Sequence, residues 1–333
     1  MKTESLFRSK ISGTGYYLPE KILSNFDLEK MVDTSDQWIR ERTGIERRHL
    51  ASPEQATSDL AVIASQNALN DAGLTSQDID MIIVATASPD QVMPSTACLL
   101  QDKLGCRNIM GFDLSAACSG FVYALSVADQ FVRTGFHKHV LVVGAEVLHR
   151  FVNYKDRETC ILFGDGAGAW IISQAGPNET NVILSSHLRT DGNLGDLFVL
   201  PAGGTRLPFS QEVLEQGLHY VRMKGREIFK HAVRTMTLVC QQALEANNHT
   251  SDQVDWVIPH QANARILQSV AEHFNIPMEK VLMYMHETGN TSAASIPIAF
   301  ELARQEGKVK RGQTILLTAF GAGITSGSLL MRY

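Results

Sequence analysis

The feature of this sequence that most constrains its fold is a faint internal repeat. The segments ALNDAGLTSQDIDMIIV and ALEANNHTSDQVDWVIP begin at Ala68 and Ala243, so they lie 175 positions apart. Each pattern predicts the end of a helix, a Thr-Ser turn, an aspartate and a buried strand. At the same shift, HVLVVGAEV (139–147) aligns with TILLTAFGA (314–322), and both predict central strands of βα units. We therefore expect an α/β chain made of two similar halves, residues 1–175 and 176–333.

The same shift places LSAACSGFVYALSVA (114–128) over GNTSAASIPIAFELA (289–303), two turns of small residues that each open a predicted helix. If the halves pack face to face, these helix starts meet at one pseudo-twofold centre. Ligands in α/β folds bind at the ends of strands, where loops supply the reactive groups. The alternative is that this repeat arises by chance, because similar βα units recur in many α/β proteins.

Composition narrows the possible functions. The chain of 333 residues is 44% hydrophobic and 20% charged, which is ordinary for a globular protein, and its net charge of -5 argues against general nucleic-acid binding. The opening MKTESLFRSK lacks an apolar signal region, and we expect a cytoplasmic protein. Neither a disulfide framework nor a metal site is expected, because the five cysteines are scattered without C-x-x-C spacing: Cys98, Cys106, Cys118, Cys160 and Cys240.

Cys118 lies in DLSAACSGF (113–121), between a predicted buried strand (108–114) and a predicted helix (121–135) that stops at Gly135. At a helix N-terminus, unpaired N–H groups and the helix dipole favour an anion, so we expect the pKa of this thiol to fall. The alternative is that Cys118 is simply a small buried hydrophobic residue, as most free cysteines are.

A reactive cysteine needs partners that are near in space although distant in sequence. Of the 11 histidines, His260 differs because it follows the predicted strand VDWVIP and begins HQANARILQ, a predicted helix start. Asn290 lies in HETGNTSAASIP, which reads as a turn and helix cap. Each residue has a purely structural interpretation, but Cys118, His260 and Asn290 together occupy strand-to-helix corners of a duplicated architecture.

Five motifs, DLSAACSGF, PHQAN, HETGNTSAAS, FGDGAGA and AFGAGITSG, together resemble the condensing enzymes of the thiolase fold, most closely β-ketoacyl-[acyl-carrier-protein] synthase III. The early VDTSDQWIRERTGIERR (32–48) resembles that family too, and the likeness runs in the same order from about residue 10 to the C-terminus. The resemblance implies a layered α-β-α-β-α fold about a pseudo-twofold axis. It also implies a homodimer that uses acyl-CoA as a substrate and needs no cofactor or metal.

The resemblance implies that Cys118 is the nucleophile, that the N–H groups of Cys118 and Ala322 form an oxyanion hole, and that His260 and Asn290 stabilise an enolate. An amide cannot ionise, so Asn290 suits charge stabilisation rather than proton transfer. Four further positions match the family's CoA-binding residues: Trp38, Arg42, Arg157 and, near the pantetheine arm, Asn263. The glycines of FGDGAGA do not predict a phosphate loop, because they run into a strand rather than a helix.

A basic stripe and one methionine complete the predicted site. On a helix, Arg226, Lys230 and Arg234 recur every four residues and form one face, which suits an acidic partner such as acyl carrier protein, although a solvated helix face is an equal alternative. By resemblance Arg265 joins this docking surface, whereas the family's further lysines fall at Glu272 and His273 here. By the same resemblance Met93 matches a position at the far wall of the partner subunit's acyl pocket, and the alternative is that it is ordinary core filling.

The function these features imply is decarboxylative condensation of a short acyl-CoA, with acetyl-CoA the expected primer, and malonyl-acyl carrier protein, which initiates fatty-acid synthesis. The nearest alternative is a related synthase of a specialised-metabolite pathway that uses another acyl-CoA. A non-catalytic partner subunit is a further alternative, disfavoured because Cys118, His260 and Asn290 are all present. A cysteine hydrolase is disfavoured because the whole-chain resemblance points to condensation.

Overall fold

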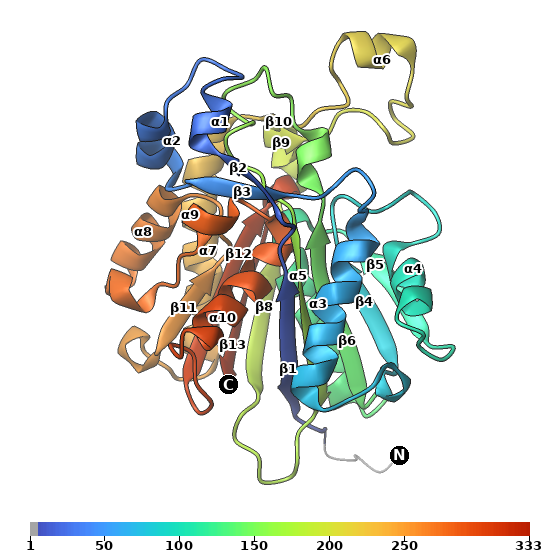
Figure 1. Ribbon diagram of the computed structural model, residues 1–333. Coiled ribbons are helices and arrows are strands. Elements are labelled where there is room, and N and C mark those ends of the chain that lie inside the picture. The colour runs from blue at the N-terminus through green and yellow to red at the C-terminus, as the bar shows by residue number, and fades with distance from the viewer. Residues whose placement is uncertain (1–5) are drawn as a thin grey trace.

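The computed structural model describes residues 6–333, which form two main sheets with helices between and around them (Figure 1). The first five residues of the N-terminal stretch considered above lie outside the described part. Within residues 6–333, none of the helices combines the length and the hydropathy needed to cross a membrane.

The first sheet has the order β1-β7-β6-β4-β5, and all its strands come from residues 9–174. These strands are β1 (Ser9–Tyr17), β4 (Met81–Ala85), β5 (Met110–Leu114), β6 (His139–Glu146) and β7 (Gly166–Gln174). The second sheet has the order β11-β12-β13-β8, and its strands come from residues 183–332. They are β8 (Ile183–Arg189), β11 (Trp256–Pro259), β12 (Thr314–Gly321) and β13 (Thr325–Arg332). The predicted central strands β6 and β12 are confirmed, since each has a hydrogen-bonded neighbour on both sides.

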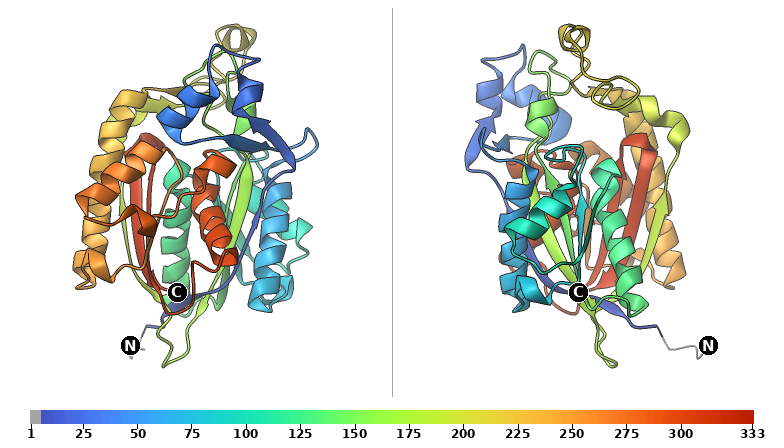
Figure 2. Two further views of the ribbon diagram at one scale, coloured as in Figure 1. Left: turned by 60° about the vertical axis from the view of Figure 1, so that its left-hand side comes forward. Right: turned by 90° about the vertical axis from the view of Figure 1, so that its right-hand side faces the viewer.

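Helices form three layers around these sheets (Figure 2). α5 (Gly120–Arg133) and α10 (Ser295–Gln305) lie between the sheets, α5 against strands of both. α3 (Thr57–Ala72) and α4 (Thr96–Lys103) cover the outer face of the first sheet. α7 (Gly225–Ala246) covers the outer face of the second, with α8 (Ala264–His273) packed beside it. The predicted layered α-β-α-β-α architecture is confirmed.

Alternating side chains explain why both faces of each sheet are covered. Along β4, Met81, Ile83 and Ala85 join the core around α5 and α10, whereas Ile82 and Val84 join the core beneath α3 and α4. All five side chains are fully buried, as the period of a strand with two apolar faces requires. The strand predicted before Cys118 corresponds to β5, but it lies at the sheet edge and is only half-buried, with Met110 43% exposed.

Smaller elements cover one end of the two sheets, at the top of Figure 1. They comprise the pairs β2 (Lys21–Ser24) with β3 (Arg47–Leu50) and β9 (Phe198–Val199) with β10 (Arg222–Met223), and the short helices α1 (Asn25–Leu28), α2 (Asp36–Thr43), α6 (Gln211–Glu215) and α9 (Met285–Thr288). The remaining helical turns are η1 (Ser76–Asp78), η2 (Ala117–Ser119), η3 (Leu148–Phe151), η4 (Gly192–Leu197), η5 (Ser251–Gln253), η6 (Met278–Lys280), η7 (Ser292–Ala294) and η8 (Ala322–Ile324).

Candidate active site

Cys118 lies where the sequence predicts it, at the junction between a strand and a helix. β5 ends at Leu114, the turn η2 contains Cys118, and α5 follows at Gly120 without a break. The residue before it, Ala117, has a φ of 47°, a left-handed conformation that few residues with a side chain adopt. Backbone conformations of this kind cluster at functional sites, because the surrounding structure must enforce them.

The prediction that the pKa of the Cys118 thiol falls is wrong. Burial raises the pKa of this thiol to about 12, and a hydroxyl group of Ser292 opposes that shift only in part. Cys118 is 6% exposed, so the cost of removing a thiolate from water exceeds the benefit of the helix N-terminus. Burial therefore favours the neutral thiol over the thiolate at this position.

The second half of the chain repeats the turn that carries Cys118. Ser292, which is 175 positions after Ala117, also has a φ of 47°, and η7 leads directly into α10 as η2 leads into α5. The two turns contact each other between the sheets, which confirms the predicted meeting of the two helix starts. The close approach needs small residues: a Cβ atom at Gly144 on β6 would lie 2.4 Å from the carbonyl oxygen of Ala293.

His260 follows β11 directly and is 2% exposed. Its backbone N–H donates to the carbonyl oxygen of Thr318 on β12 (2.8 Å), and its Nδ1 lies 2.7 Å from the Ser295 hydroxyl. The backbone N–H of Gln261 donates to that same hydroxyl oxygen (3.4 Å), so the hydroxyl hydrogen is free to point at Nδ1 and leave the proton on Nε2. Burial lowers the pKa of His260 to about 3, which keeps the ring neutral.

Asn290 is 6% exposed, and its side-chain amide is held in one orientation. The backbone N–H of Ser292 donates to Asn290 Oδ1 (2.9 Å), so the amide nitrogen is the part left to act as a donor. The backbone of Asn290 is tied to Leu162 and Gly164 by two further hydrogen bonds (2.8 and 3.1 Å). The oxygen of Asn290 therefore braces the turn before η7 rather than capping a helix, since the N-cap of η7 is Thr291, and the amide nitrogen is left available for a ligand.

Cys118, His260 and Asn290 all line one cavity of about 540 Å³. We call the part around these three residues the floor and the exposed opening the mouth. The walls between them are mainly apolar, and the lining residues include Phe163, Phe198 and Phe229. Arg42, Asn263 and Arg265 line it as well. The structure thus brings together the three residues whose association the sequence predicted, in a pocket with a polar floor, an apolar channel and a cationic rim.

Two short helical turns supply backbone donors near the thiol. Gly321 lies against the backbone of Cys118, since a Cβ atom there would lie 2.8 Å from the Cys118 nitrogen. Ala322 begins η8 and lines, together with Cys118, a smaller cavity of about 120 Å³ whose other walls include Leu148 and Leu200. The first N–H groups of a helical turn have no partner within that turn, so Cys118 and Ala322 each present one.

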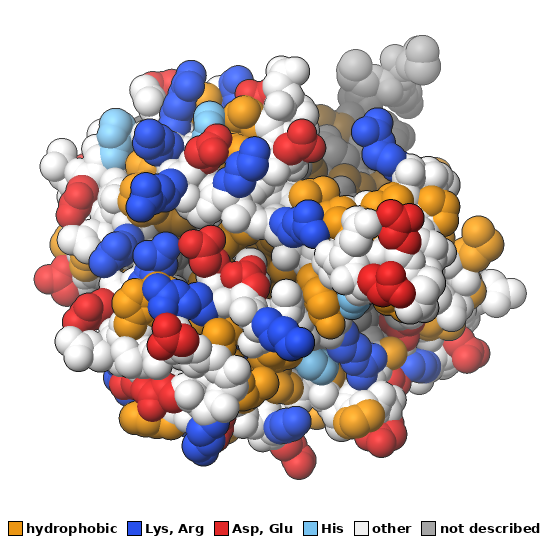
Figure 3. Space-filling view, turned by 90° about the horizontal axis from the view of Figure 1, so that it is seen from above, with side chains coloured by type: hydrophobic (Ala, Val, Ile, Leu, Met, Phe, Trp, Pro, Cys, Tyr) orange, Lys and Arg blue, Asp and Glu red, His pale blue; other side chains and the backbone are white. Residues whose placement is uncertain are grey.

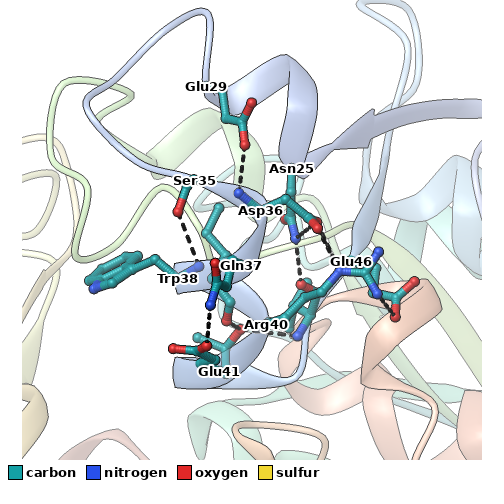
Figure 4. Close-up of polar contacts among 12 residues, drawn as sticks. Asn25, Glu29, Ser35, Asp36, Gln37, Trp38, Arg40, Glu41 and Glu46 are labelled. Carbon is teal, nitrogen blue, oxygen red and sulfur yellow. Dashed lines mark hydrogen bonds and ion pairs between the residues drawn. The ribbon is translucent and has the colours of Figure 1, made fainter.

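Trp38 is presented by α2, which a network of polar contacts holds in place (Figure 4). Ser35 caps the helix through the N–H of Trp38 (3.2 Å), and the N–H of Asp36 donates to Glu29 (2.6 Å). Arg40 bridges Asp36 and Glu46 on the other side of the helix (2.9 and 2.5 Å). The indole points away from this network (Figure 4), so it is free to contact a ligand.

The predicted CoA-binding residues lie together. The guanidinium groups of Arg42 and Arg157 lie 5.1 and 4.8 Å from the centre of the Trp38 ring. Asn263 does not lie in a helix as predicted for this stretch, because α8 begins only at Ala264; Asn263 caps α8 and donates its amide to the Arg42 carbonyl oxygen (3.0 Å). An aromatic face flanked by two guanidinium groups suits a ligand with both a base and phosphates.

The predicted basic stripe lies on α7, where Arg226, Lys230 and Arg234 are all exposed. Arg226, Lys230 and Arg265 line the rim of the large cavity, whereas Arg234 lies one turn beyond it. The space-filling view from above shows a hollow with hydrophobic side chains inside it and many lysine and arginine side chains around it (Figure 3). Met93 is 79% exposed and lies outside both cavities of its own chain.

Sequence reasoning missed the residues that orient the predicted ones. Ser295 orients His260, Ser292 holds Asn290, and the buried Gln261 braces the turn between β11 and α8 through Pro259, Leu282 and Tyr284. The two serines lie in TSAAS, a run of small residues that predicts tight packing but carries no sign of what its hydroxyls contact. Only the packing of η7 against β6 and η2 shows that.

Comparison with known proteins identifies the chain's relatives. A family model described as 3-oxoacyl-[acyl-carrier-protein] synthase III matches residues 112–192, and the model of that family's C-terminal part matches residues 244–333. β-Ketoacyl-[acyl-carrier-protein] synthase III of Caldanaerobacter subterraneus is 50% identical to the chain over 323 residues, which is 97% of each protein.

Solved structures agree with these relatives. The 3-oxoacyl-[acyl-carrier-protein] synthase III of Aquifex aeolicus superposes with a TM-score of 0.90 at 48% identity, and the match covers 98% of this chain and 100% of that one. The priming β-ketosynthase of the R1128 polyketide biosynthetic pathway superposes with a TM-score of 0.91 at 30% identity, over 99% of this chain and 98% of that one.

Proposed function

The chain belongs to the β-ketoacyl-[acyl-carrier-protein] synthase III family, and from this premise we propose that it condenses a short acyl-CoA with malonyl-acyl carrier protein and so initiates fatty-acid synthesis. The observation that carries the proposal is the arrangement of Cys118, His260 and Asn290 on one cavity floor, with the Asn290 amide nitrogen left as a donor. The reaction takes place in the cytoplasm.

In the first half-reaction Cys118 attacks the thioester carbonyl of the acyl-CoA. The oxygen of the tetrahedral intermediate accepts hydrogen bonds from the N–H groups of Cys118 and Ala322, which are preorganised and act in a site with little water. Collapse of the intermediate breaks the bond to CoA and leaves an acyl thioester on Cys118, and the departing CoA thiolate takes up a proton equivalent to the one that Cys118 loses. Trp38, Arg42 and Arg157 hold the nucleotide end of CoA, and the apolar channel accommodates the pantetheine arm beside Asn263.

In the second half-reaction malonyl-acyl carrier protein replaces CoA. Loss of carbon dioxide leaves a thioester enolate whose oxygen accepts hydrogen bonds from His260 Nε2 and Asn290 Nδ2. A neutral histidine suits this task, because it donates a proton in a hydrogen bond without releasing it to the carbanion. The carbanion attacks the acyl group on Cys118, and the β-ketoacyl product leaves on the carrier protein.

Two features concern the partners of the reaction. The docking surface for the acidic carrier protein lies at the mouth of the cavity that leads to Cys118 and consists of Arg226, Lys230, Arg234 and Arg265.

The active unit is a homodimer in which Met93 closes the acyl pocket of the partner subunit. The high exposure of Met93 and of Val92 beside it (79% and 84%) supports a partner at this loop.

The proposal is tested by product formation. Purified protein is incubated with malonyl-acyl carrier protein and, in turn, acetyl-, butyryl-, isobutyryl- and octanoyl-CoA, and the β-ketoacyl-carrier product is quantified by mass spectrometry. We expect product from acetyl-CoA with wild type and none with Cys118→Ala. Absence of product from every acyl-CoA in the wild type would contradict the proposal.

The same panel of acyl-CoAs distinguishes this function from the second candidate, a synthase of a specialised-metabolite pathway. That candidate is supported by the superposition on the R1128 priming ketosynthase, although the identity there is 30% against 48–50% for the relatives named as β-ketoacyl- or 3-oxoacyl-[acyl-carrier-protein] synthase III. Preference for a longer or branched primer with little use of acetyl-CoA favours the second candidate, whereas preference for acetyl-CoA favours the first.

A further inference from the structure

The turn η8, which carries the proposed oxyanion donor Ala322, has an unusual backbone conformation. Gly323 has a φ of 73° and Ile324 has a φ of 47°, so two successive residues lie in the left-handed region. Glycine adopts this region at little cost, but a β-branched residue such as isoleucine rarely does. The surrounding structure must therefore hold η8 in this conformation.

The turns η2 and η8 approach each other closely beside Gly321. η8 joins β12 to β13, and the last pair of that antiparallel ladder is Gly321 opposite Thr325. A Cβ atom at Gly321 would lie 2.8 Å from the Cys118 nitrogen, 2.8 Å from the Thr325 hydroxyl oxygen and 3.0 Å from the Ala116 carbonyl oxygen. A backbone group of η2, the residue before η2 and a side chain of β13 thus converge on one glycine.

Two hydroxyl groups join these turns by hydrogen bonds in opposite directions. The Ser119 hydroxyl on η2 donates to the Thr325 carbonyl oxygen (3.0 Å), and the Thr325 hydroxyl donates to the Ala116 carbonyl oxygen (3.0 Å). The Thr325 hydroxyl also lies 3.3 Å from the Ala322 carbonyl oxygen, so its single hydrogen is shared between the two turns. We call Ser119 and Thr325, with these contacts, the hydroxyl clamp.

The clamp holds carbonyl groups that lie next to the two proposed oxyanion donors. The Ala116 carbonyl oxygen also accepts the Ser119 N–H (3.1 Å), so it is fixed from both turns. The left-handed Ala117 follows it, and Cys118 comes next. On η8 the clamp contacts the carbonyl of Ala322 itself. The positions of both N–H groups therefore depend on where the clamp holds the turns.

Ser119 and Thr325 have no contact with the space that a substrate would occupy. Both residues are buried, and neither lines the cavity of about 540 Å³ or the cavity of about 120 Å³. A buried hydroxyl is costly unless it is hydrogen-bonded, and here both bonds connect segments more than 200 residues apart. Any effect of these hydroxyls on the reaction must pass through the turns that they connect.

We propose that the hydroxyl clamp sets the spacing of the Cys118 and Ala322 N–H groups, so that Ser119 and Thr325 are positioning residues of the oxyanion hole. Two donors stabilise a tetrahedral intermediate only if both point at the same oxygen, and a misplacement of about 1 Å can cost about 10²-fold in rate. The clamp should therefore affect acyl transfer to Cys118, in which an oxyanion forms. It should not affect reactions of the thiol in which none forms.

The test compares two reactions of the same thiol in Thr325→Val, which keeps the shape of threonine and lacks the hydroxyl. We expect the maximum rate of single-turnover acylation by acetyl-CoA to fall about 10²-fold, with an unchanged half-saturating concentration of acetyl-CoA. Alkylation of Cys118 by iodoacetamide should keep its rate, because displacement of iodide at a saturated carbon forms no oxyanion. Peptide mass mapping counts the exposed Cys98 separately.

Three further variants make the comparison specific. Thr325→Ser keeps the hydroxyl and should restore most of the acylation rate, whereas Ser119→Ala removes the other half of the clamp and should slow acylation. The matched control is Ser328→Ala, which removes an equally buried hydroxyl from the same strand, where it donates to the Val239 carbonyl oxygen (2.6 Å), and should not alter either rate.

Four results would overturn the clamp. They are wild-type acylation in Thr325→Val, equal losses of acylation and alkylation in that variant, acylation in Thr325→Ser as slow as in Thr325→Val, and slowed acylation in the control Ser328→Ala. If Thr325→Val does not fold, Ser119→Ala decides alone, and an unchanged acylation rate there overturns the proposal.

The clamp rests on the proposed function, since it assumes that Cys118 accepts an acyl group, but the two can fail separately. Absence of loading in the wild type contradicts the proposed function. Loading of the wild type, together with acylation that is not slowed in the clamp variants, contradicts the clamp alone.

Discussion

At the floor of the cavity Cys118, His260 and Asn290 are at most 6% exposed, whereas the side chains at its mouth are exposed arginines and lysines. The floor is uncharged at neutral pH, because burial raises the pKa of the thiol and lowers that of the imidazole. Its geometry is set by short hydrogen bonds to Ser295 and Ser292. The mouth is held by ion pairs and cation–π contacts in water, such as Arg157 beside Asp33 and over Trp38.

Because of this difference, substitutions on the floor and at the mouth should affect different steps of the reaction. On the floor, one lost donor leaves developing charge without a partner in a site where water cannot replace it, so the chemical step responds strongly. At the mouth, each charge is screened by solvent and salt, so single contributions are small and binding responds more than chemistry. The predictions below test whether this division holds.

The largest effect is expected at the floor. Asn290→Ala and His260→Ala should each slow malonyl decarboxylation roughly 10²–10³-fold, because each removes one of two donors to the enolate oxygen. Loading of Cys118 from acetyl-CoA should change far less. The two half-reactions are followed separately, by carbon dioxide release and by single-turnover acylation. Equal losses in both half-reactions would contradict the roles assigned to these residues.

A matched variant separates the donor from the turn that it supports. Asn290→Asp keeps an oxygen that accepts the Ser292 N–H but lacks the amide donor, so its decarboxylation should be as slow as that of Asn290→Ala. Recovery of activity in Asn290→Asp would mean that the residue matters for the turn alone.

The neutral floor should also make the fold sensitive to acid. The pKa of His260 is about 3 in the folded protein and ordinarily about 6.5, so below pH 6.5 the unfolded chain binds a proton that the folded protein does not. The free energy of unfolding therefore falls as pH falls, by about 2 kcal/mol between pH 7 and pH 5 from this residue. Urea unfolding of wild type and His260→Gln at both pH values measures it. The same acid-induced loss in both proteins would contradict the assignment.

A smaller, salt-dependent effect is expected at the mouth. Replacing Arg226, Lys230 and Arg234 by glutamate should raise the KM for malonyl-acyl carrier protein about tenfold at low salt and less at high salt, because the docking charges are screened. Loading from acyl-CoA should be nearly unchanged. The control replaces three exposed basic residues outside the cavity, so that net charge changes equally: Lys138, Lys310 and Arg332. An unchanged KM for the carrier protein in the first variant would remove the docking surface.

The smallest change concerns selectivity rather than rate. Met93→Phe should leave acetyl loading intact and reduce loading by isobutyryl- and octanoyl-CoA, because a rigid ring at the wall of the partner's acyl pocket cannot move aside as methionine can. Acylation of Cys118 by each acyl-CoA is compared between the two proteins. The same chain-length profile in both would mean that the pocket is closed by other residues.

Much of the fold could be predicted from the sequence, because periodicity reports which faces are buried. The repeat indicated β6 and β12 as central strands and located the two turns that meet between the sheets. The boundary of α8 was less predictable: the helix begins only at Ala264, after the cap Asn263, and its first buried side chain is Ile266. The edge position of β5 depends on strand order, which the apolar pattern of its residues does not encode.

The site was predictable in its reactive groups and unpredictable in its electrostatics. Motifs identified Cys118, His260 and Asn290, but the pKa of Cys118 depends on how completely distant segments exclude water from it, and those segments include η7 and η8.

The most direct test of the central claim is the site of acylation. The protein is incubated with acetyl-CoA alone, and its intact mass and a peptide map are recorded before malonyl-acyl carrier protein is added. The account predicts one acetyl group per chain on Cys118, unmodified thiols at Cys98, Cys106, Cys160 and Cys240, and loss of the acetyl group when malonyl-acyl carrier protein is supplied. An acetyl group on another cysteine, or one on Cys118 that malonyl-acyl carrier protein does not remove, would contradict it.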